Sequence, residues 1–409
     1  MEHKILLTAF TYGGDVMGRL EDGRAVFVPF GLPGERVRIR LTEEKRSFAR
    51  GELVEILEVS PRRIVPRCKH FGVCGGCHYQ NLPYEEQLQI KTEILRDQLT
   101  RIGRIENPPV QDMIASPNSW NYRNHVQFHL TKEGKLGYVG AGTSFAKGIM
   151  PITECYLPET AINALWPQLE FEPGTNIERV SLRAGKENDL MLILESDSPE
   201  SPELEIEAGI SVAHLFDENT LVIAGNDYIV ISVLGRDFRV SAGSFFQVNT
   251  VMAEKMVQHL LTSLPVSLSA TLLDVYCGVG LFSAFLAPKC KKVIGVESSP
   301  SACEDFAVNL DEFDNVELYE GLAEEIIPHL EAKPDIILVD PPRAGLEKRV
   351  VDGILKLNPR MISYVSCDPS TLARDAKRLI EGGYQLKQVT PFDLFPQTYH
   401  IESISIFER

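Results

Sequence analysis

The stretch SYVSCDPSTLARD, residues 363–375, places a single cysteine, Cys367, at the end of an apolar, β-prone run. The run 361–366 predicts a short buried strand, and the chain after Pro369 turns helical. A thiolate is a strong nucleophile when its pKa is lowered, for example near the N-terminus of a helix. A lone cysteine at a strand end is more often a packing residue, so a catalytic role for Cys367 requires a second reactive group.

A second reactive group is available in the stretch FDLFPQTYHIESI, residues 392–404. There His400 and Glu402 enter the last predicted strand, and the side-chain period of two directs them to the same face. A carboxylate at this place can act as a general base. The alternative is an edge-strand charge pair without any chemical role.

Two consecutive predicted strands carry acids that suit a nucleoside ligand. In LLDVYCGVGLFS, residues 272–283, an apolar strand ends in Asp274, and a turn with Gly278 and Gly280 leads into a helix. Glu297 ends the next strand and can accept hydrogen bonds from both ribose hydroxyls. The third glycine of the dinucleotide fingerprint is missing, which favours an adenosine ligand without phosphates, and S-adenosylmethionine fits. The alternative is a plain strand–helix connection.

A further acid follows the strand in IILVDPPRAGL, residues 336–346. The two prolines after Asp340 stiffen the exit from the strand and remove backbone donors. An aspartate held in this way at the edge of a sheet can hydrogen-bond a substrate or a cofactor. The alternative is a rigid turn with an exposed acid.

Three cysteines, Cys68, Cys74 and Cys77, lie within ten residues in RCKHFGVCGGCHYQN. They can hold one metal site if a fourth ligand joins them, and the candidates are His70, His78 and the distant Cys155. Soft thiolates select zinc or an iron–sulfur cluster. The spacing alone slightly favours zinc.

The elements that must position these residues form several domains, because a chain of 409 residues is too long to fold around a single hydrophobic core. Short β-prone runs between glycine turns over residues 4–60 predict a small barrel of the OB type. A helix follows from Pro83 to Gly103, with Leu88, Leu95, Leu99 and Ile102 on one face. Residues 113–245 are strand-rich. From about residue 268, strand, glycine turn and helix alternate, which predicts a parallel α/β sheet with strands at 271–275, 292–296, 336–339 and 362–365.

The formal net charge of −16 argues against a polyanionic partner, but it is unevenly distributed. Residues 1–70 contain 13 Lys and Arg against 10 Asp and Glu, a net of +3. A basic stripe in this part consists of Arg36, Arg38, Arg40, Lys45, Arg46 and Arg50. Local charge matters more than the total because salt screens interactions beyond about 8 Å, so the stripe could bind phosphates. The alternative is a solvated β-surface.

Taken together, these motifs resemble the family of uracil-C5 RNA methyltransferases over essentially the whole chain. DPPRAGL followed by SYVSCDPSTLARD is similar to the family's nucleophile signature, and FDLFPQTYHIE is similar to its C-terminal signature. The N-terminal barrel resembles the TRAM domain that many members carry for RNA. The cysteines Cys68, Cys74, Cys77 and Cys155 stand where the iron–sulfur members have the ligands of a [4Fe–4S] cluster, which overrides the slight preference for zinc.

The resemblance also implies roles for single residues. Cys367 is similar to the nucleophile of the family and Glu402 to its base. Positions that contact S-adenosylmethionine are matched by Gln247, Tyr276, Gly278, Gly280, Glu297 and Asp340. The sequence departs from the family pattern at Leu281, where asparagine is common after the second glycine, so a polar contact to the methionine end of the cofactor is in doubt and Leu281 is only a weak candidate.

The resemblance therefore predicts an N-terminal TRAM barrel (1–61), a central β-rich iron–sulfur domain (62–245) and a Rossmann-like methyltransferase domain (246–409), with the helix 83–103 packed on the last. The expected activity is S-adenosylmethionine-dependent methylation of C5 of a uridine in 23S rRNA, through a covalent adduct between Cys367 and C6. Simple tRNA-modifying members usually lack the barrel and the cluster, but archaeal-type ones have both, so a tRNA T-loop uridine stays open. A non-catalytic RNA-binding or assembly protein is a further alternative. We expect a cytoplasmic monomer without a membrane segment.

Overall fold

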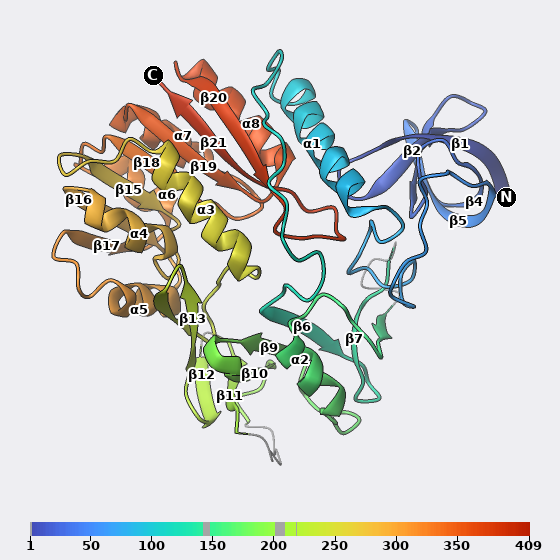
Figure 1. The fold of residues 1–409 in the computed structure, drawn as a ribbon, viewed down its shortest axis with the longest axis horizontal. Helices are drawn as coiled ribbons and strands as arrows, with labels where there is room; N and C mark the ends of the chain where they lie inside the picture. The colour runs from blue at the N-terminus through green and yellow to red at the C-terminus, as the bar shows by residue number, and fades with distance from the viewer. Residues whose placement is uncertain (1, 142–147, 201–208, 218) are drawn as a thin grey trace.

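Residues 2–58 form a closed five-stranded barrel in a computed structural model that describes residues 2–141, 148–200, 209–217 and 219–409 (Figure 1). The strands are β1 (Glu2–Phe10), β2 (Asp15–Arg19), β3 (Ala25–Pro29), β4 (Arg36–Glu44) and β5 (Phe48–Glu58), in the order β1-β2-β3-β5-β4. In β4, Val37 and Ile39 alternate with arginines and are fully buried in the barrel core. The small N-terminal barrel expected from the sequence is confirmed.

The basic stripe on this barrel is largely neutralised by acids of the barrel itself. The β4–β5 ladder sets arginines opposite glutamates, and β1 and β2 contribute further acids. The pairs are Arg36–Glu58 (3.3 Å), Arg38–Glu55 (3.1 Å), Arg40–Glu52 (2.8 Å), Lys45–Glu43 (3.1 Å) and Arg50–Asp15 (2.9 Å). Of the six basic residues, Arg46 alone has no carboxylate partner among the described residues. The stripe is therefore a solvent-exposed surface of ion pairs, and the binding of phosphates by its members stays a prediction.

A long helix, α1 (Tyr84–Arg101), joins the N-terminal half of the chain to the last domain. Its apolar side includes Ile90, Leu95 and Leu99, which are buried in the same hydrophobic core as Leu372 and Ala373 of α8 (Pro369–Glu381). Ile102, expected on that face, is 42% exposed. The helix therefore packs against α8, the helix that follows the strand with the predicted nucleophile (Figure 1).

The central part of the chain is built on a seven-stranded sheet of order β12-β11-β10-β9-β6-β7-β8. Its strands are β6 (His125–Leu130), β7 (Leu136–Val139), β8 (Ile149–Pro151), β9 (Arg179–Ala184), β10 (Leu190–Glu195), β11 (Ser211–Phe216) and β12 (Asn219–Ala224), and α2 (Thr160–Leu165) packs on it. A hairpin of β13 (Tyr228–Val233) and β14 (Arg236–Ser241) follows and leads into α3 (Thr250–Ser263).

The C-terminal domain is a doubly covered sheet of order β17-β16-β15-β18-β19-β21-β20. Its strands are β15 (Thr271–Val275), β16 (Lys292–Glu297), β17 (Val316–Glu320), β18 (Ile336–Val339), β19 (Met361–Ser366), β20 (Gln385–Phe392) and β21 (Glu402–Glu408). Its remaining helices are α4 (Leu281–Leu286), α5 (Pro300–Asn309), α6 (Ala323–Ile326) and α7 (Lys348–Leu357). The first five strands in the sheet order are parallel, whereas β21 is antiparallel to β19.

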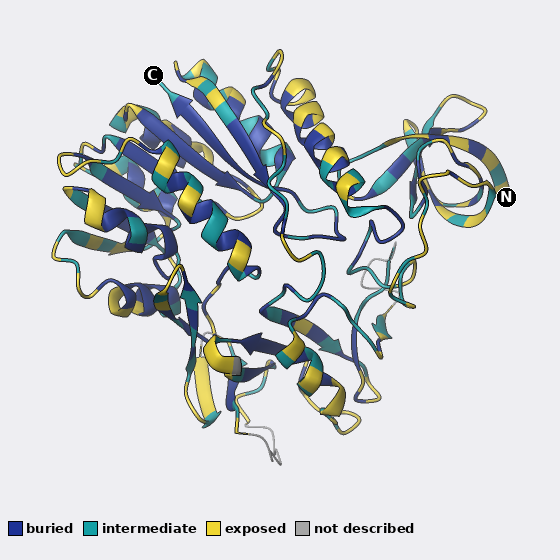
Figure 2. Ribbon diagram, viewed as in Figure 1, coloured by how far each residue is buried: buried dark blue, intermediate teal, exposed yellow. Residues whose placement is uncertain are grey.

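Both faces of this sheet are buried, as Figure 2 shows for most of its strands. Because β15, β16, β18 and β19 have helices on both sides, they consist of largely apolar runs, which is why the sequence located them within a residue or two. The edge strand β17, with the sequence VELYE, has no fully buried residue and was not predicted. The carboxyl ends of the parallel strands meet at one edge of the sheet, where open α/β sheets bind their ligands. Among the described residues, no helix has both the length and the apolar composition needed to cross a membrane.

Candidate active site and cofactor site

Cys367 lies at the carboxyl edge of the sheet, directly after β19. Asp368 follows it and caps α8, because its Oδ1 accepts hydrogen bonds from the backbone N–H groups of Ser370 (2.8 Å) and Thr371 (3.0 Å). The positive end of the helix is thus satisfied by a carboxylate and is not available to the thiol. Burial, followed by the carboxylates of Glu402 and Asp340, raises the pKa of Cys367 to about 12. Burial and these carboxylates thus oppose the lowering of the thiol pKa that a helix N-terminus by itself would cause.

Glu402 is the first residue of β21 and lies next to Cys367. The antiparallel register of β19 and β21 pairs Ser366 with Ser403, so the following pair in the same register is Cys367 and Glu402. The Glu402 side chain is buried, with 3% of its surface exposed. Burial and the nearby Asp340 raise its pKa well above the usual carboxyl value, while the Arg343 guanidinium opposes this shift. A thiol and a carboxyl group whose pKa is raised thus lie at neighbouring positions of the sheet edge.

His400 does not belong to the last strand, contrary to the sequence-based prediction, because β21 begins only at Glu402. Its ring stacks on Tyr399 with 4.3 Å between centroids and lies 3.5 Å from the Arg343 guanidinium. Burial and the Arg343 charge lower the pKa of His400 to about 2, so the imidazole is neutral. His400 therefore forms part of the wall of the site, separate from the Cys367 and Glu402 pair.

Arg343, within the motif DPPRAGL, is a functional candidate that the sequence motifs alone did not single out. It is the cation whose charge lowers the pKa values of both Cys367 and Glu402, against the effect of burial. Its side chain is exposed and reaches the same cavity as Tyr399 and His400. A sequence signal was present. Arg343 follows Asp340 by three residues, so it must lie near the same edge of the sheet.

Asp340 lies between the cofactor side and the thiol side of this edge. It follows β18 directly, and its backbone N–H donates to the Val275 carbonyl (3.1 Å). Burial, together with the charges of Asp274 and Glu297, raises its pKa to about 7. Three carboxyl groups therefore converge here, an environment that favours a cationic ligand.

Glu297 ends β16 as predicted and organises the glycine turn after β15. One of its carboxylate oxygens accepts from the Gly278 N–H (2.9 Å), and the other accepts from the N–H groups of Ser298 (2.7 Å) and Ser299 (2.8 Å). Gly278 has φ = 53°, and a Cβ added there would meet no atom within 4 Å. The turn thus exposes its backbone to open space beside a fixed carboxylate, which fits an adenosine ligand.

The neighbouring Gly280 is required for a different reason. Its φ is 89°, and a Cβ would lie 2.3 Å from Leu310 and 2.9 Å from Phe306. This glycine permits the close packing of α4 against α5 and is not an exposed part of the cofactor site. Leu281 follows it and is buried in the apolar core, so it contributes packing where the family pattern has a polar residue.

Asp274 lies within β15, one residue before its end, and is buried. Its Oδ2 accepts a hydrogen bond from the Ser283 hydroxyl (2.6 Å), whereas its Oδ1 is buried without a protein partner. Burial raises its pKa to about 7. An unpartnered buried oxygen next to the open glycine turn is a further observation that fits a bound polar ligand.

The two other predicted cofactor residues, Tyr276 and Gln247, lie in different segments. Tyr276 adopts φ = 65°, an uncommon conformation for a residue with a side chain, and its N–H donates to the Val296 carbonyl (2.8 Å). Gln247 is buried in the segment before α3, where its carbonyl accepts from the Asn124 side chain (3.0 Å). The strained backbone at Tyr276 is typical of a functional site.

The four predicted cysteine ligands, Cys68, Cys74, Cys77 and Cys155, line one cavity of about 400 Å³. They come from two segments of the chain that lie against each other, because Cys77 and Cys155 pack in one small apolar cluster with Tyr122 and Leu157. Burial raises the pKa of Cys74 to about 11 and that of Cys77 to about 12. The soft donor set fits an iron–sulfur cluster, but in the part of the chain that the structure describes no group of three or more such side chains is drawn together tightly enough to hold a metal.

The alternative ligands, His70 and His78, line the same cavity. The Nε2 of His70 accepts from the Thr153 N–H (3.1 Å), so that nitrogen is already engaged. The ring of His78 lies edge-on against Tyr399, with 4.6 Å between centroids. The cavity also reaches Arg343 and His400, so the cysteine region and the wall of the candidate active site are continuous.

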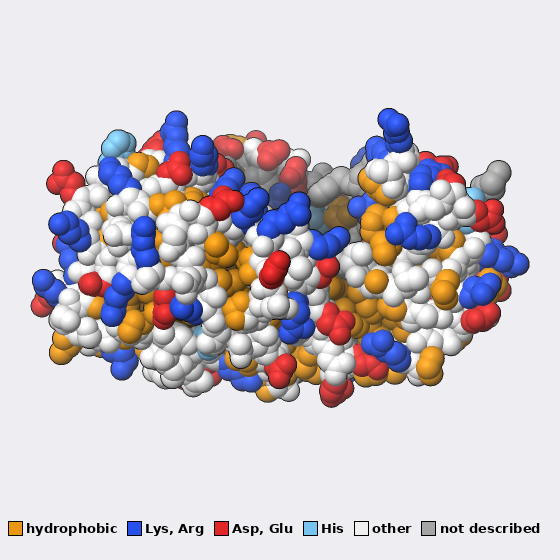
Figure 3. All heavy atoms as spheres, turned by 90° about the horizontal axis from the view of Figure 1, so that it is seen from above, with side chains coloured by type: hydrophobic (Ala, Val, Ile, Leu, Met, Phe, Trp, Pro, Cys, Tyr) orange, Lys and Arg blue, Asp and Glu red, His pale blue; other side chains and the backbone are white. Residues whose placement is uncertain are grey.

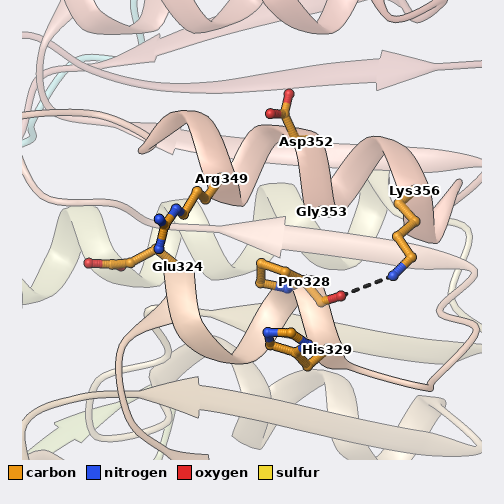
Figure 4. A pocket seen from close by; sticks show the side chains of 7 residues that line it. All are labelled: Glu324, Pro328, His329, Arg349, Asp352, Gly353 and Lys356. Carbon is orange, nitrogen blue, oxygen red and sulfur yellow. Dashed lines mark hydrogen bonds between the residues drawn. The ribbon is translucent and has the colours of Figure 1, made fainter.

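A second cavity, of about 360 Å³, lies beside α6 and α7 (Figure 4). It is lined by Glu324, Pro328, His329, Arg349, Asp352, Gly353 and Lys356. The Lys356 ammonium donates to the Pro328 carbonyl (3.1 Å). None of these residues belongs to the predicted site, and none has a buried polar atom without a partner. We assign this surface hollow no function.

Comparison with known sequences gives two kinds of match. A family model described as tRNA (Uracil-5-)-methyltransferase matches residues 216–335 and 327–409, and a TRAM domain model matches residues 2–54. An uncharacterized RNA methyltransferase of Thermosynechococcus vestitus is 33% identical over 98% of this chain and 97% of its own length. Another, from Caldanaerobacter subterraneus subsp. tengcongensis, is 34% identical over 100% of this chain and 98% of its own length.

Among solved structures, the chain is similar to that of Pyrococcus abyssi tRNA (uracil-54, C5)-methyltransferase in complex with S-adenosyl-L-homocysteine. The TM-score is 0.74 with 24% sequence identity, over 98% of this chain and 100% of that chain. At this level of identity the similarity establishes the fold. It covers the barrel, the central sheet and the Rossmann-like sheet together.

Proposed function

Because the chain belongs to the tRNA (uracil-5-)-methyltransferase family of S-adenosylmethionine-dependent RNA methyltransferases, we propose that it methylates C5 of a uridine in 23S rRNA through a covalent adduct to Cys367. The observation that carries the proposal is the cross-strand apposition of Cys367 and Glu402 beside the acids of the cofactor edge. Uracil C5 is a poor nucleophile, and its methylation requires both a nucleophile and a base at the same ring.

The proposed reaction begins when the Cys367 thiolate adds to C6 of the uracil. The new S–C6 bond displaces the C5–C6 π electrons and makes C5 enolate-like. C5 then forms a bond to the methyl group, which S-adenosylmethionine supplies from its sulfonium. The Glu402 carboxylate removes the remaining C5 proton, the C5–C6 double bond forms again, and the Cys367 thiolate leaves.

The electrostatic environment of the two residues bears on how they are used. Burial raises the pKa values of both Cys367 and Glu402, which disfavours their charged forms. Arg343 lowers both pKa values, and a cationic ligand at the acidic edge would act in the same direction. The residues that would hold S-adenosylmethionine are Glu297, by the ribose hydroxyls, the open turn at Gly278, and the acids Asp274 and Asp340.

The choice of 23S rRNA rests on the presence of the barrel and of the four cysteines, because simple tRNA-modifying members of the resembled family usually lack both. The description of the matching family model favours the alternative, a tRNA T-loop uridine. RNA binding is supported by the surface charge: Figure 3 shows several Lys and Arg side chains on the face of the chain next to the barrel. The target base must be flipped into the site, at a cost of a few kcal/mol.

Methyl transfer from tritiated S-adenosylmethionine to 23S rRNA and to tRNA transcripts tests the proposal. We expect label in 23S rRNA and none in tRNA, and mapping of 5-methyluridine in a deletion strain should show the loss of one or more rRNA sites. Label in tRNA alone would assign the alternative substrate. Binding of both RNAs without any transfer would indicate the non-catalytic RNA-binding or assembly role.

We also propose that Cys68, Cys74, Cys77 and Cys155 bind a [4Fe–4S] cluster, since all four line one cavity. Three come from residues 68–77, and Cys155 lies 78 residues beyond Cys77, so the cluster would tie two distant segments together. Metal binding would then add to the folding energy of the central domain. No step of the proposed methyl transfer moves an electron, so the group would have a structural role.

Protein purified without oxygen should be brown and contain about four irons per chain. Replacing Cys155 by serine should reduce the iron content and loosen the central domain, whereas the Rossmann-like domain should still bind S-adenosylmethionine. Cys290→Ser, at a buried cysteine outside the cavity, is the matched control and should keep the iron. A colourless preparation with one zinc per chain would reject the cluster, and unchanged metal content in Cys155→Ser would reject the fourth ligand.

A further inference from the structure

The N-terminal barrel touches the candidate active site directly, through the turn between β1 and β2. Tyr12 lies in this turn, and its hydroxyl donates a hydrogen bond of 2.9 Å to Oδ2 of Asp368, which is 356 residues away in the sequence. Asp368 follows Cys367. The contact therefore joins the barrel to the backbone that carries the proposed nucleophile.

The two oxygens of Asp368 have separate partners. Oδ1 accepts from the N–H groups of Ser370 and Thr371 and caps α8, whereas Oδ2 accepts from Tyr12. The Asp368 N–H donates in turn to the Ser366 hydroxyl (3.2 Å). Since the residues on both sides of Cys367 are held in this way, the direction of its side chain depends on how firmly the Asp368 carboxylate is fixed.

Tyr12 also contacts the segment that leads to the proposed base. Its ring packs edge-on against Tyr399, with 5.7 Å between centroids and 84° between planes. Tyr399 stacks on His400, two residues before Glu402. In Figure 1 this red loop between β20 and β21 extends below α1 toward the barrel. One barrel residue thus lies against the chain segments of both reactive groups.

The rest of the turn is fitted closely to the same region. Gly14 has φ = 90°, and a Cβ added to it would lie 2.8 Å from the His78 ring. Phe10, at the end of β1, packs edge-on against Tyr79, with 5.6 Å between centroids. Burial and the Asp368 carboxylate raise the pKa of Tyr12, so its hydroxyl keeps the proton that it donates.

We propose that Tyr12 is a positioning residue for methyl transfer: its hydrogen bond to Asp368 fixes the nucleophile loop, so that the barrel is part of the active-site scaffold and not only an RNA tether. The inference rests on the roles proposed for Cys367 and Glu402. It implies that the barrel acts on the chemical step as well as on RNA affinity.

The test compares full-length Tyr12→Phe, Asp368→Asn and the double variant in methyl transfer to 23S rRNA and tRNA transcripts. Asparagine can still cap the helix through its side-chain oxygen, but it presents an amide group to Tyr12. Each single variant should lower kcat by about tenfold or more, with KM for S-adenosylmethionine and RNA affinity within about twofold of the wild type. The double variant should lose no more than either single one, because both remove the same interaction.

Thr8→Ala is the matched control within the barrel, since it removes a hydrogen bond to the Met17 carbonyl (3.0 Å) that stays inside the barrel. It should keep the wild-type kcat. Thermal unfolding of each variant shows whether the barrel remains folded. Wild-type kcat in Tyr12→Phe would overturn the proposal. A loss of RNA affinity alone would also overturn it, because Tyr12 would then be an RNA contact. The same holds if the reduction of kcat in the double variant equals the product of the two single reductions.

Failure of the proposed function gives a different result. If Cys367 is not the nucleophile, the Cys367→Ala variant retains turnover. The hydrogen bond between Tyr12 and Asp368 then does not position a reacting group. If Cys367→Ala is inactive while Tyr12→Phe is fully active, the proposed function stands and the role of Tyr12 alone is rejected.

Discussion

Replacing Cys367 by alanine should abolish methyl transfer and leave S-adenosylmethionine binding unchanged. The thiol lies at the sheet edge beside Glu402 and Asp340, whereas the glycine turn and Glu297 that fit the cofactor lie on the other side of Asp340 in the sheet order. Without the sulfur no bond to C6 can form and C5 is not activated. Turnover should fall by about three orders of magnitude or more. Tritium transfer measures the loss, and calorimetric titration measures cofactor affinity.

The matched control is Cys290→Ala, because Cys290 is also a buried thiol in the same domain but packs in the apolar core. It should retain wild-type kcat even if its melting temperature falls slightly. Appreciable turnover by Cys367→Ala would contradict the addition mechanism. Loss of cofactor binding in the same variant would instead indicate that the substitution disturbs the sheet edge as a whole.

Replacing Glu402 by glutamine should trap the enzyme on its RNA. Glutamine has nearly the same size and can remain in the buried site, but it cannot accept the C5 proton. Addition and methyl transfer can still occur, whereas elimination of Cys367 cannot, because it requires the C5 proton to leave first. Steady-state turnover should therefore fall by about 100-fold or more, and a methylated protein–RNA adduct should accumulate.

A denaturing gel with labelled RNA would show the adduct as a slowly migrating band that depends on both RNA and S-adenosylmethionine. Glu408→Gln, at the other end of β21, is the matched control and should give wild-type turnover without a band. The band should also vanish in a Cys367→Ala, Glu402→Gln double variant. A Glu402→Gln enzyme that turns over normally, or that forms no adduct, would speak against Glu402 as the base.

The sequence by itself determined four of the five parallel strands of the Rossmann-like sheet, whereas the partly exposed edge strand β17 was not predicted. The strands predicted at 271–275 and 336–339 agree with β15 and β18, and β16 and β19 differ from the prediction by one residue at one or both ends. Buried parallel strands are continuous apolar runs, so local composition specifies them. Because residues after such strands share one edge, the convergence of Glu297, Asp340 and Cys367 follows from the order of motifs.

The sequence also determined the barrel, since alternation of apolar and polar residues with glycine turns is a local signal. It could not determine the partners of the barrel arginines. The Arg38 guanidinium can either stay free for a phosphate group or form an ion pair with a neighbouring carboxylate, and strand register decides between the two. The register of β4 and β5 places Arg38 opposite Glu55. A count of basic residues in one segment contains no information on the acids that a neighbouring strand brings opposite them.

Protonation states and long-range contacts were decided only by the tertiary structure. A helix start after Cys367 suggested a lowered thiol pKa, but Asp368 occupies that helix end, and burial beside Glu402 raises the pKa instead. The hydrogen bond from Tyr12 to Asp368 joins positions 356 residues apart, which no local pattern specifies. Such properties depend on desolvation and on the sum of nearby charges, and these exist only once distant segments have packed together.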